Sequence, residues 1–218
     1  GKWLFDNQKF NVIPNGFCVN KFRYDKTIRR TEREKLNIEE RYVLGHIGRF
    51  NEQKNHKFLL EVFAEVAKRD QKTILLLVGT GPRYDEVMSL INQHPYKQRI
   101  IIHKETSKPE NLYNAMDTFI FPSLFEGLPV VLLEAQMTGL SCLVSDVITR
   151  EVDLGENVRR LSLQEAPSVW AEQILEGNDV DRENFFEEHY KMIARYEIKE
   201  NVKILEKLYK EAYTSKYC

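Results

Sequence analysis

The sequence contains few cysteines, and their spacing suits neither a disulfide framework nor a metal site. Its 218 residues include three cysteines, with no CxxC pair and an odd one left over. Disulfide-stabilised domains and structural zinc sites need paired cysteines at short spacings. The five histidines also lack paired metal-ligand spacing. We therefore expect no bound metal, and the reducing cytoplasm is the simplest setting for the chain.

Long hydrophobic runs are missing as well. No stretch approaches the ~18 consecutive apolar residues of a membrane-spanning helix, and residues 1–30 lack the apolar centre of a signal peptide. The sequence therefore predicts no transmembrane segment. Association with the inner face of the cytoplasmic membrane stays open, because Lys199, Lys203 and Lys207 form a basic stripe on the last predicted helix. Apolar residues of that helix instead favour a face packed on the core: Ile198, Val202, Leu205, Leu208 and Ala212.

Neither sign of charge is in excess. The chain has 32 Lys and Arg against 33 Asp and Glu, which gives a formal net charge of -1. Because domains that bind nucleic acid usually carry a basic excess, we expect no nucleic-acid partner. The basic residues within 21–35 are interleaved with acidic ones, and this pattern predicts a solvated surface.

What the sequence does have is a regular alternation of apolar segments. Hydrophobic residues make up 42% of the chain, enough for the core of one domain with an appendage. Short apolar runs alternate with amphipathic segments from Tyr42 onwards. This alternation predicts an α/β fold, a doubly wound parallel sheet with a C-terminal helical extension. The predicted strands are 42–47, 73–78, 99–103, 118–121 and 140–144, and the predicted helices are 27–36, 57–69, 84–92, 108–116, 130–137 and 198–213.

The same pattern suggests a division of the chain into three parts. Residues 1–41 are expected to be a lead-in or hinge segment with a short strand at Val12 and Ile13. Residues 42–177 form the predicted Rossmann-like domain, and residues 178–218 form the C-terminal helices. In such sheets ligands bind at the carboxyl ends of the strands, so the site is expected there.

The most informative segment is 125–135, where two glutamates stand eight residues apart around an apolar helix start. Glu134 has apolar neighbours on most faces of that helix, so we expect it to be buried and to need a partner. Pro129 suits the first helical turn, and Gly127 lets a ligand approach the backbone beside Glu126. These features outline a site for an anion and for sugar hydroxyl groups.

This segment resembles the Glu-x7-Glu signature of the GT-B fold, family 4 glycosyltransferases. Four further segments resemble motifs of that family in the same order, and the five together extend over about 125 residues. The likeness is strongest to bacterial capsule and exopolysaccharide transferases. The four segments are the entry to the donor domain at 12–16, the Arg...Lys phosphate loop at 48–55, the glycine turn at 79–82 and the strand end at 121–123.

The resemblance implies a role for each side chain of the site. Arg49, after a strand, and Lys54, at the mouth of the next helix, would bracket the two phosphates of a nucleoside diphosphate sugar. Glu126 would hold hydroxyl groups of the donor hexose, and Glu134 those of the ribose. Arg49, Lys54 and Glu126 are therefore the expected catalytic residues, and neither glutamate is expected to act as a covalent nucleophile.

The family also implies backbone contacts with the donor. Those near the sugar and phosphate would come from Gly127, Leu128, Pro129 and Val130, and those near the base from Lys104, Glu105 and Thr106.

Each side chain of the site also has a simpler structural explanation. Arg49 and Lys54 could be exposed loop residues, Glu126 could cap the following helix, and Glu134 could be a buried carboxylate held by backbone or an arginine.

The expected function is the donor-binding domain of a retaining, metal-independent glycosyltransferase. It would move a hexosyl unit from a nucleoside diphosphate sugar, with UDP as the expected nucleotide, to a growing polysaccharide or a lipid-linked acceptor. Because all the motifs belong to the donor half of the family and the chain starts at Gly1, we expect an amino-terminal GT-B domain as a missing partner, without which the chain is inactive. Two other functions fit, a nucleotide-sugar-binding module without activity of its own and a GT-B sugar-nucleotide epimerase.

Overall fold

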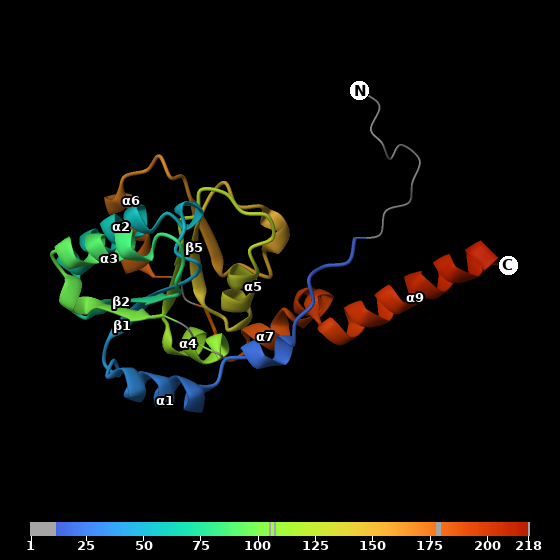
Figure 1. Ribbon diagram of the computed structural model, residues 1–218. Coiled ribbons are helices and arrows are strands. Elements are labelled where there is room, and N and C mark those ends of the chain that lie inside the picture. Colours follow the sequence, from blue (N-terminus) through green and yellow to red (C-terminus); the bar gives the residue numbers. More distant parts are fainter. Residues whose placement is uncertain (1–11, 105, 107, 178–179, 218) are drawn as a thin grey trace, which may run out of the picture.

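A six-stranded parallel sheet forms the centre of the protein (Figure 1). The structure, a computed structural model, describes residues 12–104, 106, 108–177 and 180–217. The strand order is β3-β2-β1-β4-β5-β6, and every neighbouring pair is parallel. This is the doubly wound order that the alternation of the sequence predicts. The strands are β1 (Tyr42–Ile47), β2 (Thr73–Val78), β3 (Ile100–His103), β4 (Thr118–Phe121), β5 (Ser141–Ser145) and β6 (Val158–Leu161).

Helices cover both faces of the sheet, because parallel strands need crossover connections and each strand has to bury two faces. One face carries α2 (His56–Arg69), α3 (Tyr84–Gln93) and α6 (Pro167–Glu176), whose apolar residues share one core cluster with alternate strand positions. The other face carries α4 (Pro109–Ala115), α5 (Val130–Met137) and α7 (Phe185–Glu188), which share the second cluster. Figure 1 shows the two layers on opposite sides of the sheet.

The strands and helices predicted from Tyr42 to Met137 are confirmed, with ends that differ by one residue or less. Strand β6 and helix α6 were not predicted. Two arginines occupy the middle of β6 and hide its apolar pattern, and the structure uses them as partners rather than as solvated charges. Arg159 donates to the Gln173 carbonyl at 2.7 Å, and Arg160 pairs with Asp153 at 2.6 Å. The strand predicted at Val12 and Ile13 is wrong, since neither residue has strand structure.

Helix α1 (Lys26–Leu36) packs against α4 and corrects the prediction of a fully solvated basic surface. Arg29 Nη2 lies 2.5 Å from one carboxylate oxygen of Asp117, and Arg33 Nη1 lies 3.1 Å from the other. Asp117 also accepts from the Val43 backbone N–H at 2.7 Å. These two arginines therefore join the lead-in segment to the start of β1. The pattern of charges along the sequence does not show this, because Asp117 is far from both arginines in the chain.

The carboxyl-terminal part is helical, with α8 (Tyr190–Ile193) followed by α9 (Ile198–Tyr217), which projects from the body (Figure 1). The prediction that one face of α9 packs on the core is wrong. Ile198, Val202 and Leu205 remain 38%, 44% and 42% exposed. Within the described ranges, no helix combines the length and the apolar character that crossing a bilayer requires.

Five short 3-10 helices complete the described elements: η1 (Val19–Phe22), η2 (Glu52–Lys54), η3 (Lys97–Arg99), η4 (Arg150–Val152) and η5 (Ala194–Tyr196).

Candidate functional site

Predicted site residues follow the carboxyl ends of β1, β3 and β4. The chain leaves β1 to form α2 on one face of the sheet, and it leaves β4 to form α5 on the other. The two connections diverge at this point, and doubly wound folds bind their ligands in the crevice at such a point. Arg49 follows β1, and Glu126 follows β4.

A cavity of about 410 Å³ lies beside the ends of β1, β2 and β3. Arg49 lines it from the first strand end, and Lys104 and Thr106 line it from the third. Arg49 is exposed, and its guanidinium group forms no hydrogen bond or ion pair with any residue that the structure describes. Glu105, predicted between Lys104 and Thr106, lies outside the described residues. The cavity therefore brings together two cations from separate strand ends.

Glycines at two positions of the cavity wall let the loops after β1 and β2 approach each other closely. Gly79 has φ +143°, and a Cβ atom there would lie 2.0 Å from the Gly48 carbonyl oxygen. Only glycine fits such a conformation and such an approach. A Cβ atom at Gly48 would lie 3.3 Å from Cε of Lys54. The loops after β1 and β2 thus pack backbone to backbone, and Lys54 lies directly against the first of them.

Lys54 and Glu126 form an ion pair across the crevice. Lys54 Nζ lies 2.6 Å from Glu126 Oε1, and the two side chains are 11% and 8% exposed. Gln53 Nε2 donates to the other carboxylate oxygen at 2.9 Å and to the Phe125 carbonyl at 2.8 Å. Lys54 Nζ also lies 4.5 Å from the centre of the Phe121 ring. Both oxygens of Glu126 therefore have donors from η2, and the contact with Gln53 was not predicted.

The turn that carries Lys54 is fixed by asparagines. The Asn51 side chain accepts from the Lys54 backbone N–H at 3.2 Å, which caps η2. Asn55 then adopts the left-handed region at φ 53°, so the chain turns sharply into α2. Short polar residues at these two positions explain why the loop presents Lys54 inward instead of continuing as a regular helix.

Two buried histidines lie beneath this turn. His46 Nδ1 donates to the Ile120 carbonyl at 2.9 Å, between β1 and β4. Burial lowers the pKa of His46 well below its ordinary value, and it lowers that of His56 to about 4. Both rings are therefore neutral at pH 7, and they support the Lys54 turn without adding further positive charge beneath it.

The segment between the two glutamates leads directly into α5. A Cβ atom at Gly127 would meet no atom within 4 Å, so space is open on that side of the backbone. Leu128 is 37% exposed, Pro129 is buried, and α5 begins at Val130 without a side-chain cap. Because no side chain caps α5, Glu126 is not its capping residue, and among the described residues no side chain accepts from the backbone N–H groups of its first turn.

Glu134 lies one turn further along α5, and its partner is a tyrosine rather than backbone or an arginine. Tyr113 Oη, from α4, donates to Glu134 Oε2 at 2.9 Å. Burial raises the pKa of Glu134 to about 7, the Tyr113 hydrogen bond opposes this, and the Glu110 charge adds to it. Tyr113 and Gln53 were not predicted to contribute, since their partners lie 21 and 73 residues away in the sequence.

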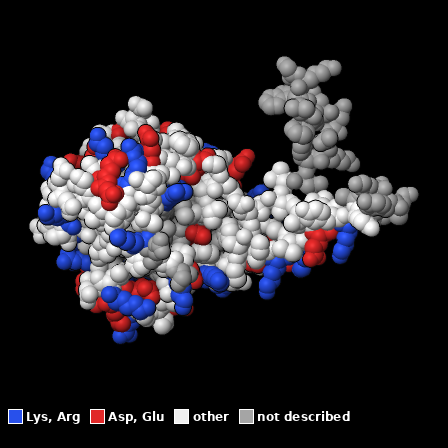
Figure 2. Space-filling view, viewed as in Figure 1, with Lys and Arg blue, Asp and Glu red and all other residues white. Residues whose placement is uncertain are grey.

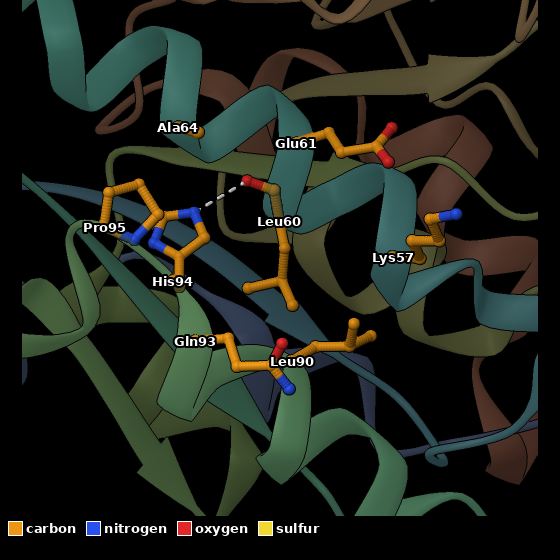
Figure 3. Close-up of a pocket in the computed structure, with 8 residues that line it drawn as sticks. All are labelled: Lys57, Leu60, Glu61, Ala64, Leu90, Gln93, His94 and Pro95. Carbon is orange, nitrogen blue, oxygen red and sulfur yellow. Dashed lines mark hydrogen bonds between the residues drawn. The ribbon is translucent and has the colours of Figure 1, made fainter.

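A second cavity, of about 280 Å³, lies between α2 and α3, away from the strand ends (Figure 3). Its walls are largely apolar, with Leu60 and Leu90 among the lining residues. His94 Nε2 lies 3.1 Å from the Leu60 carbonyl oxygen, which the dashed line marks. No predicted site residue lines this cavity, so the crevice at β1 and β4 remains the candidate site.

The described residues show neither a metal-ligand cluster nor, on the face in Figure 2, a surface of one sign of charge. Among the described residues, no group of three or more His, Cys, Asp or Glu side chains is placed to hold a metal ion. Figure 2 shows Lys and Arg interspersed with Asp and Glu over the face in view. On this face, the charged residues do not form the extended basic surface that nucleic-acid-binding proteins use.

The sequence is similar to known glycosyltransferases. The family described as glycosyl transferases group 1 matches residues 28–176. EpsF of Bacillus subtilis, which is named as a glycosyltransferase, is 35% identical over 218 residues, 96% of this chain and 56% of that protein. A UDP-Gal:alpha-D-GlcNAc-diphosphoundecaprenol alpha-1,3-galactosyltransferase of Escherichia coli is 29% identical over 146 residues, 65% of this chain and 38% of that protein. The chain thus spans about half, or less, of the length of these relatives.

Solved structures confirm the predicted fold. HepE of Anabaena, in complex with UDP-glucose, superposes with a TM-score of 0.75 and 20% identity over 92% of this chain and 57% of that chain. The C-terminal domain of a group 1 glycosyl transferase, LpcC of Francisella tularensis, gives a TM-score of 0.65 and 18% identity over 84% of this chain and 100% of that chain. The architecture is that of a domain of GT-B glycosyltransferases.

Proposed function

Because this chain belongs to the glycosyl transferases group 1 family, we propose that it binds a nucleoside diphosphate sugar in the crevice between β1 and β4. It is the donor-binding part of a retaining glycosyltransferase that needs no metal ion, and UDP is the nucleotide. The observation that carries the proposal is the arrangement of charge at the strand ends. Arg49 and Lys54 come from the loop after β1, Lys54 pairs with Glu126 from the segment after β4, and Arg49 lines the neighbouring cavity.

The cations serve the diphosphate. Arg49 has no partner among the described residues and lines the cavity, so it is available to an incoming phosphate. Lys54 is held by Glu126. A phosphate that approaches Lys54 competes with that carboxylate, and Glu126 then turns to hydroxyl groups of the hexose. Positive groups close to the bridging oxygen stabilise the charge that develops as the sugar–phosphate bond breaks.

The remaining predicted residues serve the nucleoside and the sugar. Glu134 binds the ribose hydroxyls through its carboxylate. The backbone of residues 127–130 borders the hexose and the phosphate, and the open space at Gly127 supports a close approach. Residues 104–106 border the base, because Lys104 and Thr106 line the cavity at the end of β3. None of these groups acts as a covalent nucleophile, and retention is tested by the anomeric configuration of the product.

A further GT-B domain, outside the sequence, completes the enzyme. The relatives named above are longer than this chain, and the exposed apolar residues of α9 supply a surface that such a domain could cover. The acceptor is a polysaccharide or lipid-linked saccharide, a proposal supported by the diphosphoundecaprenol in the name of the Escherichia coli relative. The reaction takes place on the cytoplasmic side of the membrane, where the donor is available.

A thermal-shift screen tests the proposed donor. UDP and UDP-sugars should raise the unfolding temperature in the presence of EDTA, because a ligand that binds only the native state stabilises it. Adenosine and guanosine nucleotides serve as comparisons, and UDP-glucose, UDP-galactose and UDP-N-acetylglucosamine test the sugar. Stabilisation by no uridine nucleotide, or by UDP only after addition of a divalent metal, would contradict the proposal.

Substitution of Arg49 should weaken UDP binding without changing the fold. Arg49→Ala removes one charge-assisted contact with the diphosphate, for which we expect a loss of about 2 kcal/mol, or roughly 30-fold in affinity. The unfolding free energy should be unchanged, since Arg49 is exposed and pairs with no described residue. Calorimetric titration measures the affinity, and Arg83→Ala, which removes an arginine paired with Glu86, is the matched control. Equal affinities of Arg49→Ala and the parent would remove Arg49 from the phosphate site.

The two glutamates should affect different parts of the donor. Glu134→Gln should weaken UDP and UDP-glucose by a similar factor, about tenfold at pH 8, because both ligands carry the ribose. Glu126→Gln should not weaken the affinity for UDP, because it removes the carboxylate that competes with phosphate for Lys54, and it should weaken the added contribution of the hexose. Titrations of both variants with both ligands measure this. If the two variants lose UDP and UDP-glucose equally, the assignment of ribose and hexose is wrong.

A further inference from the structure

Tyr113 places a hydroxyl group inside an apolar layer. The side chain is fully buried, and its ring lies edge-on to Phe22 and Phe119, at centroid distances of 6.2 and 5.8 Å. A phenylalanine would fill the same space and bury no polar atom. Since a buried hydroxyl group is unfavourable unless it is hydrogen-bonded, this one calls for a reason beyond packing.

The hydroxyl group reaches from α4 to α5 and contacts the ribose carboxylate proposed above. Tyr113 Oη lies 2.9 Å from Glu134 Oε2 and 3.2 Å from the Val131 carbonyl oxygen. In the part of the chain that the structure describes, no residue donates to Glu134 Oε1. One carboxylate oxygen is therefore fixed by the protein, and the other remains available to a ligand.

We propose that Tyr113 is a positioning residue for donor binding, whose hydroxyl group holds Oε2 of Glu134 so that Oε1 accepts a hydrogen bond from the ribose. This inference rests on the proposed role of Glu134. Tyr113 does not touch the ligand itself. Its contribution is to fix the plane of the carboxylate before the nucleotide arrives, so that less freedom is lost on binding.

The same hydrogen bond also favours the charged form of Glu134. Burial raises the pKa of Glu134, the charge of Glu110 on α4 adds to this, and the Tyr113 hydroxyl opposes both. The pKa of Tyr113 is itself raised well above its ordinary value by burial and by Glu134, so the hydroxyl keeps its proton near neutral pH. Without the hydroxyl group, the pKa of Glu134 rises further, and less carboxylate is present at pH 7.

Tyr113→Phe tests the inference because it removes only the hydroxyl group. The affinity for UDP-glucose should fall about tenfold at pH 7, and its pH midpoint should move upward, so that binding recovers partly towards pH 8.5. The matched control is Tyr42→Phe. It also removes a tyrosine hydrogen bond, the one between Tyr42 Oη and Thr118 Oγ1 (2.6 Å), which lies at the opposite ends of the strands. It should bind like the parent.

A second measurement does not depend on the ligand. The NMR signal of the Glu134 carboxyl carbon, followed against pH in the free protein, should titrate at higher pH in Tyr113→Phe than in the parent or in Tyr42→Phe. If the parent does not bind UDP-glucose, or if Glu134→Gln binds it like the parent, the proposed function is wrong and this inference falls with it. If both behave as expected but Tyr113→Phe binds and titrates like the parent, only the role of Tyr113 is overturned.

Discussion

Lys54→Met is expected to destabilise the protein by about 3 kcal/mol, because it leaves the carboxylate of Glu126 buried without its counter-ion. Methionine keeps an unbranched apolar side chain of similar length, so the effect reports the loss of charge. Breaking a buried ion pair from one side is costly, whereas removal of both charges is much less so. The double variant Lys54→Met with Glu126→Gln should therefore recover most of the loss. Chemical denaturation at pH 7 measures all three variants.

The control for this prediction lies on α9. Lys203 forms an ion pair with Glu200 at 2.7 Å, nearly the same length as the Lys54 pair, but its two side chains are 69% and 58% exposed. Exposed pairs contribute less than about 1 kcal/mol. Lys203→Met should therefore have little effect. A similar loss for the two lysine variants, or no recovery in the double variant, would show that burial of the Lys54–Glu126 pair does not govern its stability.

The unfolding free energy of Glu134→Gln, minus that of the parent, is expected to be larger at pH 8 than at pH 4.5. In the folded protein the pKa of Glu134 is about 7, against an ordinary value of 4.5. Between these values the native state holds a proton that the unfolded chain has released, so the parent loses stability as the pH rises. The shift between the two pKa values corresponds to a loss of about 3 kcal/mol in the unfolding free energy of the parent. Glutamine does not titrate and still accepts from Tyr113.

Denaturation of parent and variant across this pH range measures the effect. Glu165→Gln, which removes an exposed carboxylate, is the control for changes in net charge. If the difference between Glu134→Gln and the parent is the same at pH 4.5 and pH 8, the burial of Glu134 does not weaken its ionisation. The expected result would mean that the buried carboxylate of Glu134 lowers the stability of the protein, as functional groups in binding sites commonly do.

The sequence alone determined the architecture from Tyr42 to Met137. Short apolar runs and amphipathic helical stripes are local patterns, and their regular alternation leaves few possible topologies. The predicted sheet also placed Arg49 and Glu126 at one edge, because the carboxyl ends of parallel strands meet there. The resemblance to the GT-B family added Lys54 and Glu134 to them. Buried apolar strands such as β2 are read easily, while β6, with paired arginines, is not.

Only the tertiary structure decided which groups touch. The sequence predicted that Glu134 needs a partner, but Tyr113 is one of ten tyrosines, and nothing local marks its hydroxyl group for Glu134. Likewise, Lys54 and Glu126 were predicted in one site, while their ion pair and the Gln53 contact depend on how two loops 72 residues apart meet. Hydrogen bonds and ion pairs act over a few ångströms in space and carry no signal along the chain. Periodicity therefore specified the sheet and its edge, and packing alone specified the partners of each charge.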